Sequence, residues 1–300
     1  MDFDYTPVSK FLELEQLDTC LFRGLTPKPS YPRIFGGQVL AQAMNAATRT
    51  IDPSRTIHSL HGYFLRPGNP EKPIIYDVDR IRDGGSFTTR RVIAKQSGNA
   101  IYSCELSFML PSAGVAHQEN MPTLWSEDDI NQLESETQFN ARMQTTYPNK
   151  FKPEPNIFTE WDIRRIHRVD PFSPEPSPPL KEYWLKYNTP LPIKSENNSS
   201  TDYFLQHQTL LAYISDMGLM GSAFLPHQIT YYTNTVQAAS LDHVMWFHQP
   251  CNINEWIYYR CESPWAGAGR GLSFGRLYSQ KGLLLASTAQ EGLMRPFRKQ

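Results

Sequence analysis

The sequence predicts an α+β fold built from two similar halves, each with a helix and an antiparallel sheet. Strand-like alternation of apolar and polar residues recurs in both halves of the 300-residue chain. Each half runs in the same order, from a helical stretch through an extended segment ending in aromatic-x-x-Pro to three strands. A proline-rich region separates the halves, because 12 of the 24 prolines lie between Pro111 and Pro192.

The first half contains one predicted helix and four extended segments. The helix covers 36–51, GGQVLAQAMNAATRTI, and starts with two glycines. The extended segments are 58–68, 74–81, 86–96 and 100–110. Only Ser97 and Gly98 separate the last two, which is typical of a tight turn in an antiparallel hairpin.

The second half repeats this order. A helix is predicted over 204–218, and the extended segments are 240–250, 255–263, 269–280 and 283–294. Equivalent residues lie at offsets of 183, 184 and 185: Pro67 and Pro250, Gly98 and Gly282, Met109 and Met294. A helix laid over a curled antiparallel sheet, used twice, predicts a double hotdog by internal duplication.

The middle region is predicted to be a surface connection between the halves. Its 113–155 segment is polar, with a short helix expected near Glu127–Arg142. Asp170–Pro179, DPFSPEPSPP, is excluded from helices and central strands because proline lacks the amide donor. The predicted organisation is an N-terminal hotdog repeat at 1–112, a linker at 113–155 and a C-terminal repeat at 156–300.

Composition excludes several classes of protein. A net charge of −1 opposes nucleic-acid binding by the whole chain. We expect no membrane span, because no run of 18 apolar residues occurs. The four widely spaced cysteines favour reduced thiols in an intracellular protein. Neither a dinucleotide fingerprint nor metal-ligand spacing is present, so we expect no cofactor and no metal.

One catalytic motif match is rejected. Gly271–Gly275 reads G-x-S-x-G, but it lies in a predicted strand rather than a strand–turn–helix elbow. No Asp follows Asp242 and no His follows His248, so the partners of a serine nucleophile are missing. The strand histidines His58, His61, His243 and His248 are interpreted as packed side chains.

Asp216 stands out because it is the only Asp, Glu, Lys or Arg between Tyr203 and Leu241. Helical periodicity favours an exposed position, whereas its apolar neighbours favour a buried carboxylate with a function. Two weaker candidates are Ser240, which opens a strand, and Gln290, which shares a strand face with apolar residues. A buried glutamine must find hydrogen-bond partners.

Several long segments resemble the acyl-CoA thioesterase II family, a bacterial and peroxisomal group with a double-hotdog fold. The resemblance runs from about Leu14 to Arg295, and the linker is least similar. The segments that carry it are FGGQVLAQA (35–43), HSLHGYFLRPG (58–68), PIIYDVDRIRDGGSF (73–87), LAYISDM (211–217), LDHVMWFHQP (241–250), NEWIYY (254–259) and ASTAQEGLMR (286–295). It implies an active site made of Asp216, Ser240 and Gln290.

The resemblance also implies a substrate, an assembly and a compartment. The expected reaction is hydrolysis of fatty acyl-CoA to fatty acid and CoA, in a homo-oligomer that is a dimer or tetramer. Peroxisomal matrix and cytosol both stay open, because the C-terminus reads PFRKQ rather than the S-K-L type.

The expected chemistry is direct attack by a water that Asp216 activates and that Ser240 and Gln290 orient. Backbone amides of Gly36 and Gly37, at the start of a helix, are candidates to hold the oxyanion. No single cation is assigned to the CoA phosphates; those available are Arg66, Arg82, Arg90, Arg91, His248, Arg260 and Arg270.

Two alternatives remain. A double-hotdog enoyl-CoA hydratase or dehydratase fits the fold, but its G-D-x-N-P-x-H run is absent. A non-catalytic acyl-CoA-binding protein also fits the fold, although the three polar site residues are present.

Overall fold

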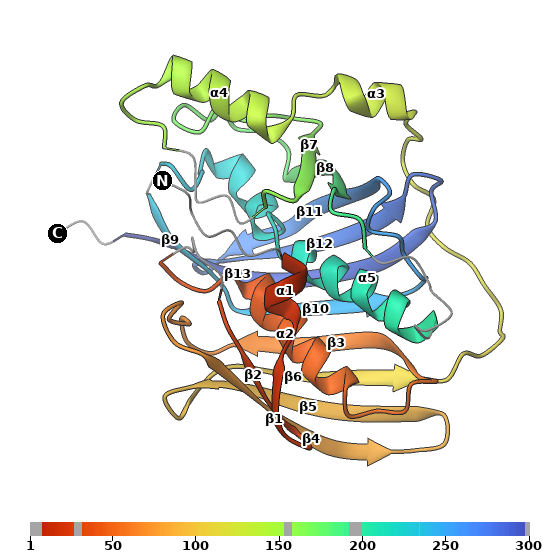
Figure 1. The fold of residues 1–300 in the computed structure, drawn as a ribbon. Helices are drawn as coiled ribbons and strands as arrows, with labels where there is room; N and C mark the ends of the chain where they lie inside the picture. The colour runs from red at the N-terminus through yellow and green to blue at the C-terminus, as the bar shows by residue number, and fades with distance from the viewer. Residues whose placement is uncertain (1–7, 27–31, 153–157, 192–199, 234, 298–300) are drawn as a thin grey trace.

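A computed structural model describes residues 8–26, 32–152, 158–191, 200–233 and 235–297 (Figure 1). The first half contains α1 (Val8–Leu12), β1 (Glu15–Asp18), β2 (Leu21–Gly24), α2 (Gly36–Thr48), β3 (Thr56–Phe64), β4 (Ile74–Asp83), β5 (Phe87–Gln96) and β6 (Asn99–Met109). The middle region contains α3 (Glu127–Gln132), α4 (Glu136–Thr146), β7 (Trp161–Arg165) and β8 (Leu180–Tyr187). The second half contains α5 (Ser200–Ser215), the 3₁₀ helix η1 (Met220–His227), β9 (Val236–Ser240), β10 (Asp242–Phe247), β11 (Ile257–Gly267), β12 (Arg270–Ser279) and β13 (Leu284–Pro296).

All strands join one antiparallel sheet in the order β1-β2-β4-β5-β6-β3-β10-β13-β12-β11-β8-β7, with β9 also paired to β13. The order repeats about its centre, since β4-β5-β6-β3 on one side matches β11-β12-β13-β10 on the other. Gly98 and Gly282 make equivalent hairpin turns with φ of +79° and +82°, a region that favours glycine. The predicted α+β double hotdog is confirmed.

The two halves meet at the β3–β10 pair. His243 lies opposite Gly62 in this pair, and Asp242 lies opposite Tyr63. A single apolar core includes Leu40 and Leu60 from the first half together with Ile214 from the second. The halves therefore share one sheet and one core.

Helices α2 and α5 lie side by side against the sheet (Figure 1). Ten of the 13 residues of α2 are buried, and α5 is buried throughout from His207 to Ser215. Such nearly complete burial places both helices in the interior of the protein. Their approach is close at Gly37, where an added Cβ would lie 2.1 Å from the backbone oxygen of Tyr213.

The middle region is more structured than predicted. Two helices, α3 and α4, replace the single short helix expected near Glu127–Arg142, and each starts with a serine capping box, at Ser126 and at Ser135. Asp170–Pro179 forms no helix or strand, as predicted. The two outermost strands at each end of the sheet, β1 with β2 and β7 with β8, were not predicted. The last residues of the predicted linker, 153–155, lie outside the described residues.

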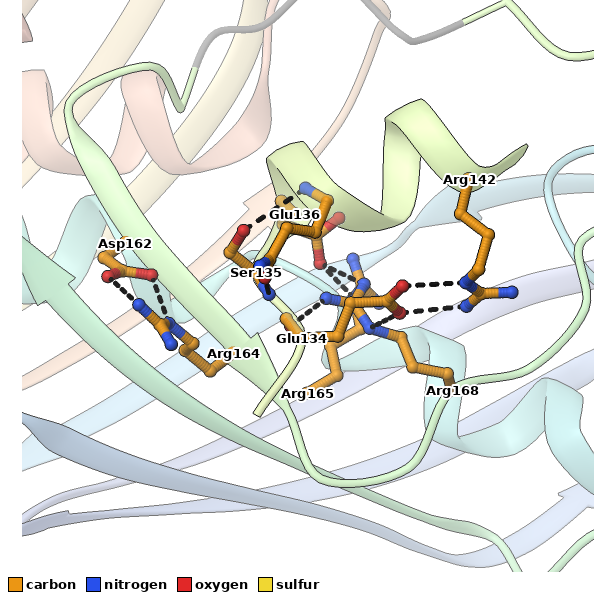
Figure 2. Close-up of polar contacts among 9 residues, drawn as sticks. Glu134, Ser135, Glu136, Arg142, Asp162, Arg164, Arg165 and Arg168 are labelled. Carbon is orange, nitrogen blue, oxygen red and sulfur yellow. Dashed lines mark hydrogen bonds and ion pairs between the residues drawn. The ribbon is translucent and has the colours of Figure 1, made fainter. Parts of the chain in front are cut away.

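An ion-pair cluster fastens α4 to the segment around β7 (Figure 2). Glu136 accepts from Arg165 at 2.5 Å and from Arg168 at 2.8 Å, while Glu134 accepts from Arg142 at 2.7 Å. Burial raises the pKa of Glu136, but Arg165 and Arg168 outweigh it, so this pKa lies below its ordinary value. These ion pairs hold α4 against the β7 segment within the middle region. The domain boundaries at 112 and 155 stay a prediction.

No helix among the described residues is both long enough and apolar enough to cross a lipid bilayer.

Candidate active site

Asp216 directly follows the last residue of α5, and only 5% of its side chain is exposed. Of the two positions that the sequence left open, the buried one is therefore confirmed, while the function of the carboxylate stays a prediction. Periodicity favoured exposure because it assumed a helix with one solvent-exposed face, whereas α5 is buried at every residue from His207 to Ser215. A carboxylate in such a position needs hydrogen-bond donors.

Gln290 supplies one of these donors. It lies on β13 with 1% of its surface exposed, and its Nε2 donates to Asp216 Oδ1 over 2.6 Å. The same amide nitrogen lies 3.3 Å from His243 Nδ1. The other amide atom, Oε1, is buried and has no hydrogen-bond partner among the described residues. Gln290 therefore presents an open acceptor beside the carboxylate.

His243 of β10 is the polar neighbour that the sequence analysis treated as a packed side chain. It is fully buried, with Nδ1 3.7 Å from Asp216 Oδ1 and Nε2 3.0 Å from Ser215 Oγ. Burial lowers the pKa of His243 below its ordinary value, against the opposite pull of Asp216. The alternation of residues along β10 could have predicted the burial of His243, because His243 lies on the same strand face as Met245 and Phe247, which are buried.

Gly36 brings the start of α2 to the carboxylate. A Cβ at Gly36 would lie 2.6 Å from Asp216 Oδ2 and 2.8 Å from Phe64 Cζ, so there is room only for glycine. The first helical bonds to Phe35 O come from the Gln38 and Val39 amides. The amides of Gly36 and Gly37 lie before these, where a helix offers no carbonyl partner.

Ser240 ends β9 and lies opposite Gly292 of β13. Opposed residues of an antiparallel pair share a sheet face, and so do residues two apart along a strand. Ser240 is therefore on the face that carries Gln290. Among the described residues, however, no hydrogen bond joins Ser240 to Asp216 or to Gln290.

The G-x-S-x-G match lies in a strand, as predicted. Gly271–Gly275 lies inside β12, and its Ser273 is fully buried, with its Oγ in hydrogen-bond contact with Ser222 Oγ at 2.9 Å. Within the described ranges, no three His, Cys, Asp or Glu side chains gather as metal ligands would.

Most of the cations named as candidates for phosphate binding have acidic or serine partners. Arg90 pairs with Asp83, Arg91 with Asp79, Arg260 with Glu262 and Arg270 with Glu291, while His248 bonds Ser287. Arg66 differs, because it lies with Lys72 in an open pocket of about 340 Å³ without an acidic lining residue. The pocket is near α2, since Gly68 O accepts from Ile34 N at 3.1 Å.

Comparison with known proteins gives consistent matches over both halves. Residues 26–109 match the family "Acyl-CoA thioesterase N-terminal domain", and residues 185–293 match the family "Acyl-CoA thioesterase". Acyl-CoA thioesterase 2 of Haemophilus influenzae is 36% identical over 95% of both chains. Acyl-coenzyme A thioesterase 8 of mouse is 38% identical, over 96% of this chain and 88% of the mouse protein.

The crystal structure of an acyl-CoA thioesterase II from Mycobacterium marinum superposes with a TM-score of 0.74 at 37% identity. The superposition covers 98% of this chain and 99% of that one.

Proposed function

The chain belongs to the acyl-CoA thioesterase II family, and from this membership and the geometry of its site we propose that it hydrolyses fatty acyl-CoA to fatty acid and CoA. One observation carries the proposal for the site. A buried carboxylate, Asp216, contacts both the Gln290 amide and the start of α2. These parts supply a base, an orienting group and backbone donors for an oxyanion.

In the proposed reaction a water molecule attacks the thioester carbonyl carbon directly. Asp216 takes one proton from this water, while the O–H that remains donates a hydrogen bond to Gln290 Oε1, so that a lone pair of the water oxygen points at the substrate. The new C–O bond makes the carbonyl oxygen an oxyanion, which accepts from the Gly36 and Gly37 amides. The C–S bond then breaks, and the CoA sulfur takes the proton from Asp216. Ser240, on the same sheet face, is proposed to orient water or substrate.

The alternatives are not favoured. Hydratase or dehydratase activity and non-catalytic binding both lack support from the matched families, which are thioesterases. The oligomeric state (dimer or tetramer) and the compartment (peroxisomal matrix or cytosol) stay predictions. Light scattering of the purified protein tests the first, and the distribution of a tagged copy tests the second.

The substrate has an anionic end, and the pocket with Arg66 and Lys72 is proposed to bind phosphate groups of CoA. Its cations lack acidic neighbours in the pocket lining, and it lies beside the segment leading into α2. Cations of this kind bind phosphate oxygens through charge-assisted hydrogen bonds.

Loss of the carboxylate is predicted to stop turnover. Asp216→Asn should lower kcat for thiol release from acyl-CoA by at least about 100-fold, because the base is lost. Gln290→Ala should give a loss of similar size. Glu291→Gln is the matched control, since Glu291 adjoins Gln290 but pairs with Arg270. Undiminished thiol release in Asp216→Asn, or hydration of an enoyl-CoA by a wild type that releases no thiol, would disprove the assignment.

Gly36→Ala tests the start of α2. The added methyl group would collide with Asp216 Oδ2 and Phe64, and kcat should fall by roughly tenfold or more as the carboxylate and helix start move apart. Gly85→Ala is the control, because nothing lies within 4 Å of its added Cβ. Equal kcat values for Gly36→Ala and Gly85→Ala would show that Gly36 is not part of the active site.

Arg66→Ala tests the phosphate pocket. KM for an acyl-CoA should rise by about five- to tenfold with kcat little changed, because binding is lost equally in ground and transition states. For the matching acyl-pantetheine, which lacks the phosphates, KM should not change. Arg80→Ala, an exposed arginine paired with Asp83, serves as control. Equal effects of Arg66→Ala on both substrates would contradict phosphate binding at Arg66.

A further inference from the structure

Ser215, His243, Gln290 and Asp216 form a chain of hydrogen bonds whose direction the geometry determines. Ser215 Oγ lies 2.8 Å from Ala212 O, a carbonyl that only accepts, so the hydroxyl donates its single proton there. The contact of 3.0 Å between Ser215 Oγ and His243 Nε2 must then be donated by the ring. His243 therefore carries its proton on Nε2.

A neutral ring protonated on Nε2 has a lone pair on Nδ1. Burial lowers the pKa of His243 below its ordinary value, against the opposite effect of Asp216, and so favours the neutral ring at pH 7 and above. The ionisable groups near it are Asp216, Tyr259, whose hydroxyl donates to Ser215 O, and Tyr102, which lies over Gly62 opposite His243. Burial raises the pKa of both tyrosines well above 10, so Asp216 supplies the only charge in this set.

Both neighbours of Gln290 Nε2 are thus acceptors: the Asp216 carboxylate at 2.6 Å and the His243 Nδ1 lone pair at 3.3 Å. The amide has two N–H donors, one for each. If the amide were flipped by 180°, Oε1 would take the place of Nε2 and face the Asp216 oxygen and the His243 lone pair. These three acceptors would then have no donor among them. Gln290 Oε1 must therefore point away from His243 Nδ1 and from Asp216 Oδ1. This oxygen is the buried acceptor that has no partner among the described residues.

We propose that His243 is a positioning residue of the hydrolytic site: its Nδ1 lone pair holds the Gln290 amide so that Oε1 faces the water activated by Asp216. Ser215 in turn fixes the tautomer of His243. The effect of His243 on catalysis rests on the proposed function. The tautomer and the amide orientation are properties of the folded protein and can be measured without substrate.

The direct test is the protonation state of His243. In ¹⁵N-histidine-labelled protein, long-range ¹H–¹⁵N spectra should show the Nε2–H tautomer for His243 from pH 7 to 8. Its signal is assigned among the eight histidines by its loss in His243→Asn. Ser215→Ala, a smaller side chain at a buried position, should shift the population towards Nδ1–H. A cationic ring, an Nδ1–H ring in the wild type, or an unshifted spectrum in Ser215→Ala would overturn the proposal.

Kinetics separate positioning from packing. His243→Leu should lower kcat by about ten- to a hundredfold with KM changed less than about twofold, since an orienting group is lost. His243→Asn, whose Oδ1 restores an acceptor near Nδ1, should recover most of that kcat. His58→Leu is the control, because His58 is also a strand histidine bonded to a serine, at 2.8 Å from Ser107 Oγ. Equal losses in His243→Leu and His243→Asn, with both variants folded, would assign His243 to packing alone.

The two proposals fail in different ways. If the wild type releases no thiol from any acyl-CoA while the spectra show the Nε2–H tautomer, the proposed function is wrong and the hydrogen-bond chain stands. If the wild type is active and the tautomer is Nδ1–H, the role of His243 is wrong and the thioesterase assignment stands.

Discussion

The site depends on one hydrogen bond, from the Gln290 amide to the Asp216 carboxylate. A nearly buried carboxylate is costly without donors, and this bond of 2.6 Å supplies one from the central strand β13. The bond ties the end of α5 to β13, and the carboxylate that it holds also lies against Gly36 at the start of α2. The shared core of the two halves is what keeps these parts in register.

The same arrangement explains how charge is handled during hydrolysis. The negative charge starts on Asp216, whose Oδ2 lies at the positive end of the α2 dipole. As the base takes a proton, the charge moves to the carbonyl oxygen of the substrate, which in our account faces the amides of the same helix start. The negative charge therefore moves only a short distance and stays at the positive end of the α2 dipole. Because of this, the protein needs little reorganisation during the reaction.

Much of the fold could be predicted from the sequence, and part of the site could not. Strand alternation and the turns at Gly98 and Gly282 reveal the duplicated meanders, because these signals are local. The serines that cap α3 and α4 are local features too, and they mark where each helix starts. The orientation of Asp216 and the partners of His243 depend on long-range packing, since His243 contacts residues 28 and 47 positions away. Periodicity alone cannot report such contacts.

The central claim is that Asp216 activates water rather than forming a bond to the acyl group. A single turnover in H₂¹⁸O, followed by mass spectrometry of the acid and of the peptide containing Asp216, tests it most directly. The account predicts ¹⁸O in the fatty acid on this first turnover and none in Asp216. Unlabelled acid together with ¹⁸O in Asp216 would reveal an acyl–aspartate intermediate and contradict the account.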